Sequence, residues 1–105
     1  MPDELDFSVA VETDGAVRVI RLAGELDVAT APQLRAAFAE PIQETTVIVD
    51  MAELSFMSST GVGELVIARQ RGIEAGWTLK LRGATGTVAN VLRVTGVDKV
   101  VPIEP

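Results

Sequence analysis

Cysteine, histidine and tyrosine are absent from this chain, and the first two absences limit its chemistry. Without cysteine there is no disulfide, no thiolate metal site and no cysteine nucleophile. Without histidine there is no serine–histidine–aspartate triad, no histidine base and none of the common zinc sites. We therefore expect no catalytic residues, no metal ion and no cofactor, and we do not expect an enzyme.

Aromatic residues are also scarce, with one Trp and three Phe among 105 residues. Because 48% of the residues are apolar, the core has to be built from Val, Leu, Ile and Ala. A chain of this length is large enough for a single hydrophobic core. The sequence therefore predicts one domain that spans residues 1–105.

Basic residues are outnumbered, with 9 Lys and Arg against 15 Asp and Glu, so the net charge is -6 at pH 7. Such a balance disfavours binding to nucleic acid or to an anionic membrane. No apolar run approaches the ~20 residues that span a bilayer, and Met1–Asp6 lack the basic and apolar segments of a signal peptide. We expect a cytoplasmic protein that binds no nucleic acid and does not insert into a membrane.

The spacing of apolar residues predicts strands that alternate with helices. Strands are expected at residues 7–12, 16–23, 46–50, 78–82 and 100–103, the last at a sheet edge because of Pro102. Helices are expected from Thr30 to Pro41, from about Thr60 to Gly76, and from Thr85 or Thr87 to Gly96. This order indicates an α/β fold in which helices pack on a sheet.

Three consecutive hydroxyl residues, Ser58, Ser59 and Thr60, stand between a strand pattern and a helix pattern. Serine and threonine are favoured at helix N-caps because their oxygens accept unpaired backbone N–H groups. The same end of a helix carries partial positive charge and accommodates phosphate. Ser59 is therefore either an ordinary cap or a place where a phosphate is attached.

Other motifs match known chemistry less well. Gly61-Val62-Gly63 begins like a dinucleotide fingerprint but lacks the third small residue, and 83–87 lacks the Lys of a phosphate loop. Glu25 and Asp27 are close enough for a carboxylate pair, but loop carboxylates or partner contacts are the better interpretation. Asp50 and Glu53 are interpreted as structural residues at a strand end.

Two longer segments resemble the STAS family, the sulfate-transporter and anti-sigma-factor-antagonist domains. Residues 49–62 look like its signature, and Leu22–Asp27 resembles its second hallmark, an apolar residue that leads into G-E-[LI]-D. The strand around Leu79–Leu81 and the helix from Val88 to Thr95 fall where that family has them. The resemblance implies a mixed β-sheet with helices packed mainly on one face.

Free-standing members of this length are most often bacterial anti-sigma factor antagonists, which bind an anti-sigma serine kinase and thereby free a sigma factor. The family's phosphoacceptor motif reads D-S-[ST]-G, and its alignment on Gly61 places the acceptor on Ser59. A serine phosphatase is implied as a further partner. The partner-binding residues implied are Gly24, Glu25, Leu26, Asp27, Ser58, Ser59, Thr60, Gly61 and Val62.

The chain departs from that motif at one position, since Ser58 stands where the family has aspartate. Thr60 or Ser58 could therefore take the phosphate instead of Ser59. Two other functions stay open: a constitutive adaptor, for example in a lipid-transport ABC system, and a domain that binds a nucleotide or small ligand. At Gly61 we expect the small residue to let a partner backbone approach closely.

Overall fold

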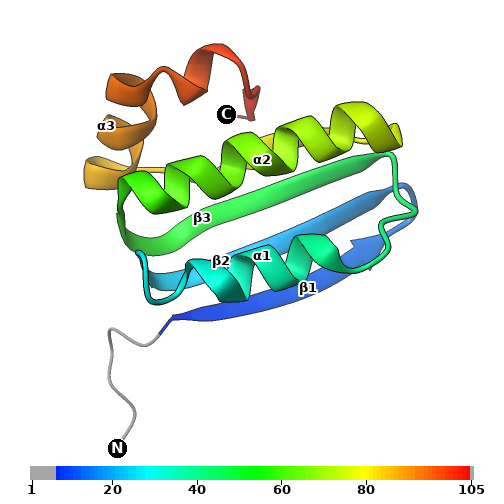
Figure 1. Cartoon of the computed structure of the whole chain (residues 1–105), viewed down its shortest axis with the longest axis horizontal. Coiled ribbons are helices and arrows are strands. Elements are labelled where there is room, and N and C mark those ends of the chain that lie inside the picture. Colours follow the sequence, from blue (N-terminus) through cyan, green and yellow to red (C-terminus); the bar gives the residue numbers. More distant parts are fainter. Residues whose placement is uncertain (1–6, 105) are drawn as a thin grey trace, which may run out of the picture.

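A computed structural model describes residues 7–104, which form five strands, three α-helices and a short 3-10 helix (Figure 1). Met1–Asp6, on which the signal-peptide expectation depends, lie outside the described residues, as does Pro105. The strands are β1 Ser8–Asp14, β2 Val17–Leu26, β3 Thr46–Met57, β4 Thr78–Arg82 and β5 Ile103–Glu104. The helices are α1 Ala31–Ala39, α2 Ser59–Ala75, α3 Gly86–Thr95 and the 3-10 helix η1 Val97–Lys99.

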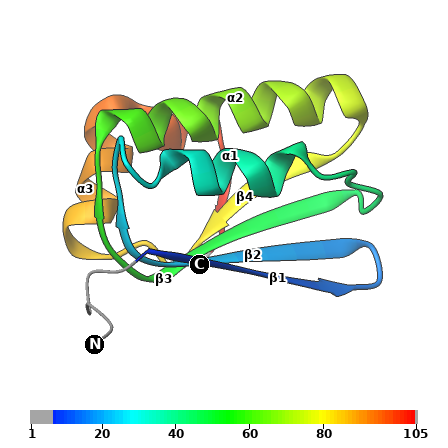
Figure 2. The ribbon, with the colours of Figure 1, turned by 60° about the horizontal axis from the view of Figure 1, so that its bottom comes forward.

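The strands form one sheet in the order β1-β2-β3-β4-β5. β1 and β2 make an antiparallel hairpin, whereas β3, β4 and β5 each join in parallel. Figure 2 shows α1 and α2 side by side over one face of the sheet, with α3 beside the end at which α2 begins. The expected mixed sheet with helices mainly on one face is therefore confirmed.

The core lies between the sheet and the helices. Because side chains alternate along a strand, the three middle strands send every second residue toward the helices, except beyond Met51 of β3, where every third residue is buried. Leu34 of α1, Leu65 of α2 and Leu92 of α3 meet them from above. The buried strand residues include Ile20, Leu22, Val47, Val49 and Leu81. As expected, aliphatic side chains make up nearly all of this core.

Two strands are longer than the sequence pattern predicts. β2 continues past Ala23 to Leu26, and β3 continues past Asp50 to Met57. The pairing shifts register twice on the way, and Gly24, at φ 95°, lies at the second shift. A left-handed glycine is typical of such a bulge. The extra residues lie on β3, where every third residue from Met51 to Met57 is buried, so its period-two pattern ends early. β2 keeps its alternation to Leu26, and it was expected to end at Ala23 because Gly24 looked like an interruption.

Other boundaries agree closely with the sequence. α2 and α3 end at left-handed glycines, Gly76 and Gly96, as expected. β5 lies at the sheet edge as expected, but it begins at Ile103 rather than at Val100. The residues before it, 97–99, form η1 instead.

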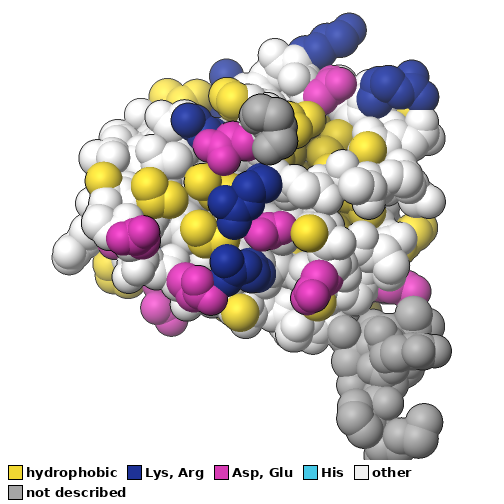
Figure 3. All heavy atoms as spheres, turned by 180° about the vertical axis from the view of Figure 1, so that it is seen from behind, with side chains coloured by type: hydrophobic (Ala, Val, Ile, Leu, Met, Phe, Trp, Pro, Cys, Tyr) yellow, Lys and Arg dark blue, Asp and Glu magenta, His cyan; other side chains and the backbone are white. Residues whose placement is uncertain are grey.

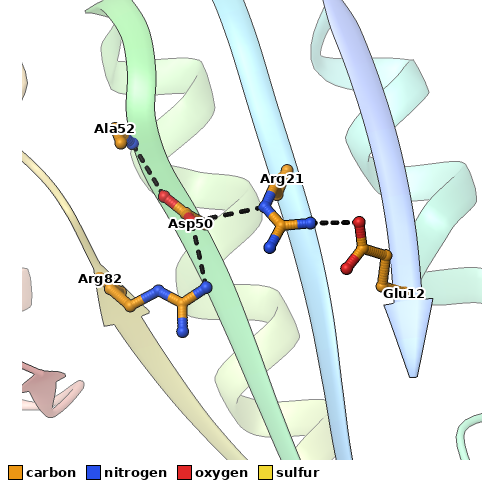
Figure 4. Close-up of polar contacts among 5 residues, drawn as sticks. All are labelled: Glu12, Arg21, Asp50, Ala52 and Arg82. Atoms are coloured by element: carbon orange, nitrogen blue, oxygen red, sulfur yellow. Dashed lines mark hydrogen bonds and ion pairs between the residues drawn. The ribbon is translucent and has the colours of Figure 1, made fainter. Parts of the chain in front are cut away.

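The face of the sheet that the helices leave open carries a row of charged side chains (Figure 3). Arg21 of β2 pairs with Glu12 of β1, and its Nε lies 3.7 Å from Asp50 Oδ2 on β3. Arg82 of β4 approaches the same carboxylate oxygen at 3.1 Å (Figure 4). Opposite charges therefore alternate across four adjacent strands and tie them together laterally.

Asp50 is the centre of this row. Burial alone would raise its pKa, but the Ala52 N–H bond to Oδ1 and the Arg82 and Arg21 guanidinium groups outweigh that effect. They hold the pKa of Asp50 below its ordinary value. The interpretation of Asp50 as a structural residue agrees with these contacts.

Candidate functional site

The two segments singled out in the sequence meet at one corner of the fold. Leu26, the last residue of β2, pairs with Met57, the last residue of β3. The Ser58 N–H then donates a hydrogen bond of 2.9 Å to the Leu26 carbonyl oxygen. The loop after β2 and the start of α2 consequently lie side by side, and we call residues 25–30 and 58–63 the switch corner.

The three hydroxyl residues of the corner differ in exposure. Ser59, the first residue of α2, is exposed, whereas Thr60 is half-buried. Ser58 occupies the N-cap in extended conformation, and its Oγ is buried without a hydrogen-bond partner among the described residues. Of the three, Ser59 therefore offers the most accessible hydroxyl.

The start of α2 is not capped by any side chain. The first helical hydrogen bond runs from the Val62 N–H to the Ser58 carbonyl oxygen, at 3.1 Å. The alternative in which Ser59 is the ordinary N-cap is wrong, because Ser58 holds that position and Ser59 lies inside the helix. The backbone N–H groups at this end keep the partial positive charge that favours an anion.

The other half of the corner is held by its own polar side chains. Asp27 Oδ1 accepts hydrogen bonds from the N–H groups of Ala29 at 3.0 Å and Thr30 at 3.1 Å. The Thr30 hydroxyl donates to the Glu25 carbonyl oxygen at 2.8 Å and accepts from the Asp27 N–H at 2.9 Å. Thr30 occupies the N-cap position of α1, but its side chain makes no cap bond and instead closes this loop.

Several residues expected to contact a partner are buried. Leu26 has no exposed surface, and Gly24, Gly61 and Val62 are also buried. A Cβ at Gly61 would lie 2.8 Å from Leu26 Cγ and Cδ2. The small size of Gly61 is therefore required by Leu26, and the approach of a partner backbone at this residue stays a prediction.

The corner also carries exposed apolar side chains that the sequence reasoning did not single out. Val28 projects from the loop after β2 and is 75% exposed. Val66 is exposed on α2, seven residues after Ser59, which is the helical spacing that places two side chains on the same side. That spacing was the available signal for Val66, whereas Val28 follows no pattern.

A buried carboxylate, on the residue directly after the corner, pairs α2 with α1. The Glu64 side chain is 7% exposed, and its Oε2 accepts a hydrogen bond of 2.7 Å from the Arg35 guanidinium. This bond and the charge of Glu64 raise the pKa of Arg35. The pair holds the first turns of α2 in one orientation.

The switch corner offers a hydroxyl group that can accept a group transferred from another molecule. Ser59 has no hydrogen-bonded base among the described residues, so nothing there activates it as a nucleophile. Within residues 7–104 no cluster of acidic side chains could hold a metal ion, and no helix is long and apolar enough to cross a membrane. An exposed hydroxyl at an uncapped helix start suits modification by another protein.

Comparison with known proteins agrees with this geometry. The family model described as STAS domain matches residues 8–105. An anti-sigma F factor antagonist from Lysinibacillus sphaericus is 42% identical over 84 residues, which cover 75% of this chain and 70% of the relative.

Solved structures give the same result. The crystal structure of an anti-sigma factor antagonist from Mycobacterium paratuberculosis has a TM-score of 0.83 at 25% identity, covering 100% of this chain and 91% of that one. The Bacillus cell fate determinant SpoIIAA in its phosphorylated form has a TM-score of 0.67 at 31% identity, covering 93% and 92%.

Proposed function

The chain belongs to the STAS domain family, and on that premise we propose that it is an anti-sigma factor antagonist controlled by phosphorylation of Ser59. In this proposal the unphosphorylated switch corner binds an anti-sigma serine kinase, and the bound kinase releases a sigma factor. A serine phosphatase restores the unphosphorylated form. The protein acts in the cytoplasm as a regulator and catalyses no reaction.

The observation that carries this proposal is the position of Ser59. Its side chain is exposed at the first residue of α2, and the hydrogen bond from Ser58 to Leu26 brings it beside Glu25, near the end of β2, and Asp27, in the loop that follows. A phosphate would add about -1.5 to -2 charges at this point. A partner that docks across the corner would then have to desolvate that charge, so affinity falls.

The exposure pattern supports Ser59 over its neighbours as the acceptor. Ser58 Oγ is buried and would have to leave its site to meet the γ-phosphate of ATP. Thr60 is half-buried in the first turn of α2. The relatives named as anti-sigma factor antagonists, and the SpoIIAA structure in a phosphorylated form, support an antagonist of this kind but do not select among the three hydroxyl residues.

The surface expected to meet the kinase is the exposed part of the corner. Glu25, Asp27, Val28 and Ser59 are accessible to different degrees, and Val66 extends the surface along α2. The buried residues Gly24, Leu26, Gly61 and Val62 shape the corner from below. In this proposal they influence binding through the backbone that they position.

Isothermal titration with the kinase tests the proposal, using the wild-type chain, Ser59→Ala and Ser59→Asp. We expect Ser59→Ala to bind as wild type, and Ser59→Asp to bind about tenfold more weakly because one carboxylate only partly mimics a phosphate. Thr87→Asp is the matched control, since Thr87 is an exposed hydroxyl in the first turn of α3.

Two outcomes would redirect the assignment. Binding that Ser59→Asp leaves unchanged, with no phosphate accepted in the presence of ATP, would favour the constitutive adaptor. Binding of a nucleotide at the corner in place of a kinase would favour the ligand-binding domain.

A further inference from the structure

A second surface lies at the opposite end of α2, away from the switch corner. There the C-terminal half of α2, the start of β4 and the segment before β5 enclose a hollow of about 360 Å³. Trp77 and Leu79 are buried in its floor, whereas Ile73 and Val100 are exposed at its rim. The hollow is therefore mainly apolar and open to solvent on one side.

One wall of the hollow is an unfinished sheet edge. β5 pairs only with Leu81 and Arg82, so β4 has no outer neighbour at Thr78–Lys80 among the described residues. Three residues of strand give an open edge of about 10 Å. Because the Thr78 N–H donates to the Thr45 carbonyl oxygen inside the sheet, Leu79 is the residue of this stretch whose N–H and C=O face outward and can hydrogen-bond to an added segment of extended chain.

The open edge is blocked at one end. The Leu81 N–H donates a hydrogen bond of 2.9 Å to the Pro102 carbonyl oxygen, which closes the edge from that residue onward. A long strand that ran through the hollow would collide with residues 100–102. The space fits the last few residues of a chain that enters beside Thr78 and stops before Val100.

A positively charged side chain lies at the closed end of the hollow. Arg69 lines the hollow, and its Nε donates a hydrogen bond of 3.0 Å to the Val100 carbonyl oxygen. Within residues 7–104 no carboxylate forms an ion pair with Arg69. In a chain with net charge -6, this positive group is positioned for a carboxylate supplied from outside.

We propose that this hollow binds the free carboxyl terminus of a partner polypeptide. The terminal residues add to β4 as a short parallel strand, an apolar side chain fills the space between Ile73 and Val100, and the terminal carboxylate meets Arg69. This site is separate from the switch corner, so that phosphorylation at Ser59 and binding at β4 are independent events. It would let the protein hold a second partner while the corner exchanges the first.

The probe is a displayed library of random heptapeptides with free carboxyl termini, selected on the whole protein. We expect enrichment of sequences that end in an aliphatic residue. A synthetic copy of the strongest sequence is then compared with its carboxyl-terminal amide by fluorescence anisotropy, and the amide should bind about tenfold more weakly.

Matched variants locate the site. Arg69→Gln and Ile73→Ser should each weaken binding of the selected peptide about tenfold. Arg71→Gln and Ile67→Ser are the controls, because they make the same changes on the side of α2 that faces α1, and they should bind as wild type. Ser59→Asp should also bind the peptide as wild type.

Three results would overturn the proposal: no enrichment of any terminal sequence, equal binding of acid and amide, or equal loss in the control variants. Loss of peptide binding in Ser59→Asp alone would place the peptide at the switch corner and equally refute a site at β4. The kinase measurement uses different variants, so failure of one proposal leaves the other standing.

Discussion

Leu26 and Gly61 interlock at the base of the switch corner. The Leu26 side chain occupies the space that a side chain at Gly61 would need, with Cγ and Cδ2 both 2.8 Å from the position of a Cβ. The end of β2 and the first turn of α2 are thus packed together with no room between them. The effect of a substitution at Gly61 on stability therefore depends first on this packing.

We expect Gly61→Ala to lower the free energy of unfolding by about 1–3 kcal/mol, the usual cost of overpacking a core. Gly63→Ala is the matched control, because a Cβ there meets nothing within 4 Å. It should be neutral or stabilising by up to about 1 kcal/mol, since alanine favours a helix. Urea unfolding measures both, and equal effects of the two substitutions would contradict the packing argument.

Asp27 is expected to act mainly through the loop that it holds. Asp27→Ala removes the acceptor of two backbone N–H groups and should cost about 1–2 kcal/mol, as loss of a capping side chain does. Asp27→Asn keeps an oxygen at that position and should cost clearly less. Thermal unfolding compares the two. If they are equally unstable, the hydrogen bonds to Oδ1 are not what stabilises the loop.

A substitution at Glu25 should change binding to the kinase but not the stability of the protein. Glu25 lies near the end of β2, just before the loop of Asp27, and only its backbone carbonyl is used by Thr30. We expect Glu25→Gln to leave the unfolding midpoint within about 0.5 kcal/mol of wild type and to reduce affinity for the kinase. Calorimetric titration of the folded variant with the kinase measures this affinity. An unchanged affinity would show that Glu25 is not part of the binding surface.

Ser58→Ala should not destabilise the protein, although the residue occupies the N-cap of α2. Its hydroxyl is buried without a partner among residues 7–104, so removal of the oxygen abolishes an unsatisfied group. We expect a free energy of unfolding equal to wild type or up to about 1 kcal/mol higher. A free energy of unfolding lower than that of wild type by about 1 kcal/mol or more would mean that the hydroxyl makes a stabilising hydrogen bond.

The charge row on the open sheet face makes stability depend on pH through Asp50. Because the pKa of Asp50 is lowered in the folded state, its contribution is complete above the unfolded pKa of about 3.9. That contribution is lost as the pH falls through the lower folded value. The difference in stability between wild type and Asp50→Asn should therefore shrink in acid.

The measurement is urea unfolding of both proteins across the acid range, with Glu53→Gln as the control. Glu53 is an exposed carboxylate on the same strand that forms no ion pair among residues 7–104, so it shows what the loss of one carboxylate does outside the charge row. A difference between wild type and Asp50→Asn that stayed constant in acid would show that the carboxylate charge of Asp50 adds no stability.

The sequence predicted the order of strands and helices because the apolar periodicity in most elements is regular. It failed at the end of β3, where extra residues interrupt the alternation, and at the end of β2, which continues past Gly24 to Leu26. It also failed at η1, a single short turn before Val100 that has no period to detect. Helix ends were predicted well because Gly76 and Gly96 mark them chemically.

The two segments of the candidate site were named from the sequence, but the way they pack was not. The motifs around Gly24–Asp27 and Ser58–Gly61 indicated two segments of one corner, and the parallel pairing of β2 with β3 brings them together. The exposure of each site residue could not be deduced from the sequence in the same way. Whether Gly61 faces a partner or Leu26 depends on packing between residues 35 positions apart, to which no local pattern refers.

Ser59 is the residue whose phosphorylation is proposed to control binding of the kinase at the switch corner. The direct test is intact-mass and fragment mass spectrometry of the wild-type chain and Ser59→Ala, each incubated with ATP and the anti-sigma kinase that it binds. Wild type should gain one phosphate on Ser59 and then leave the kinase, and Ser59→Ala should gain none and stay bound. A phosphate found only on Ser58 or Thr60, or no phosphate on a chain that binds the kinase, would contradict the account.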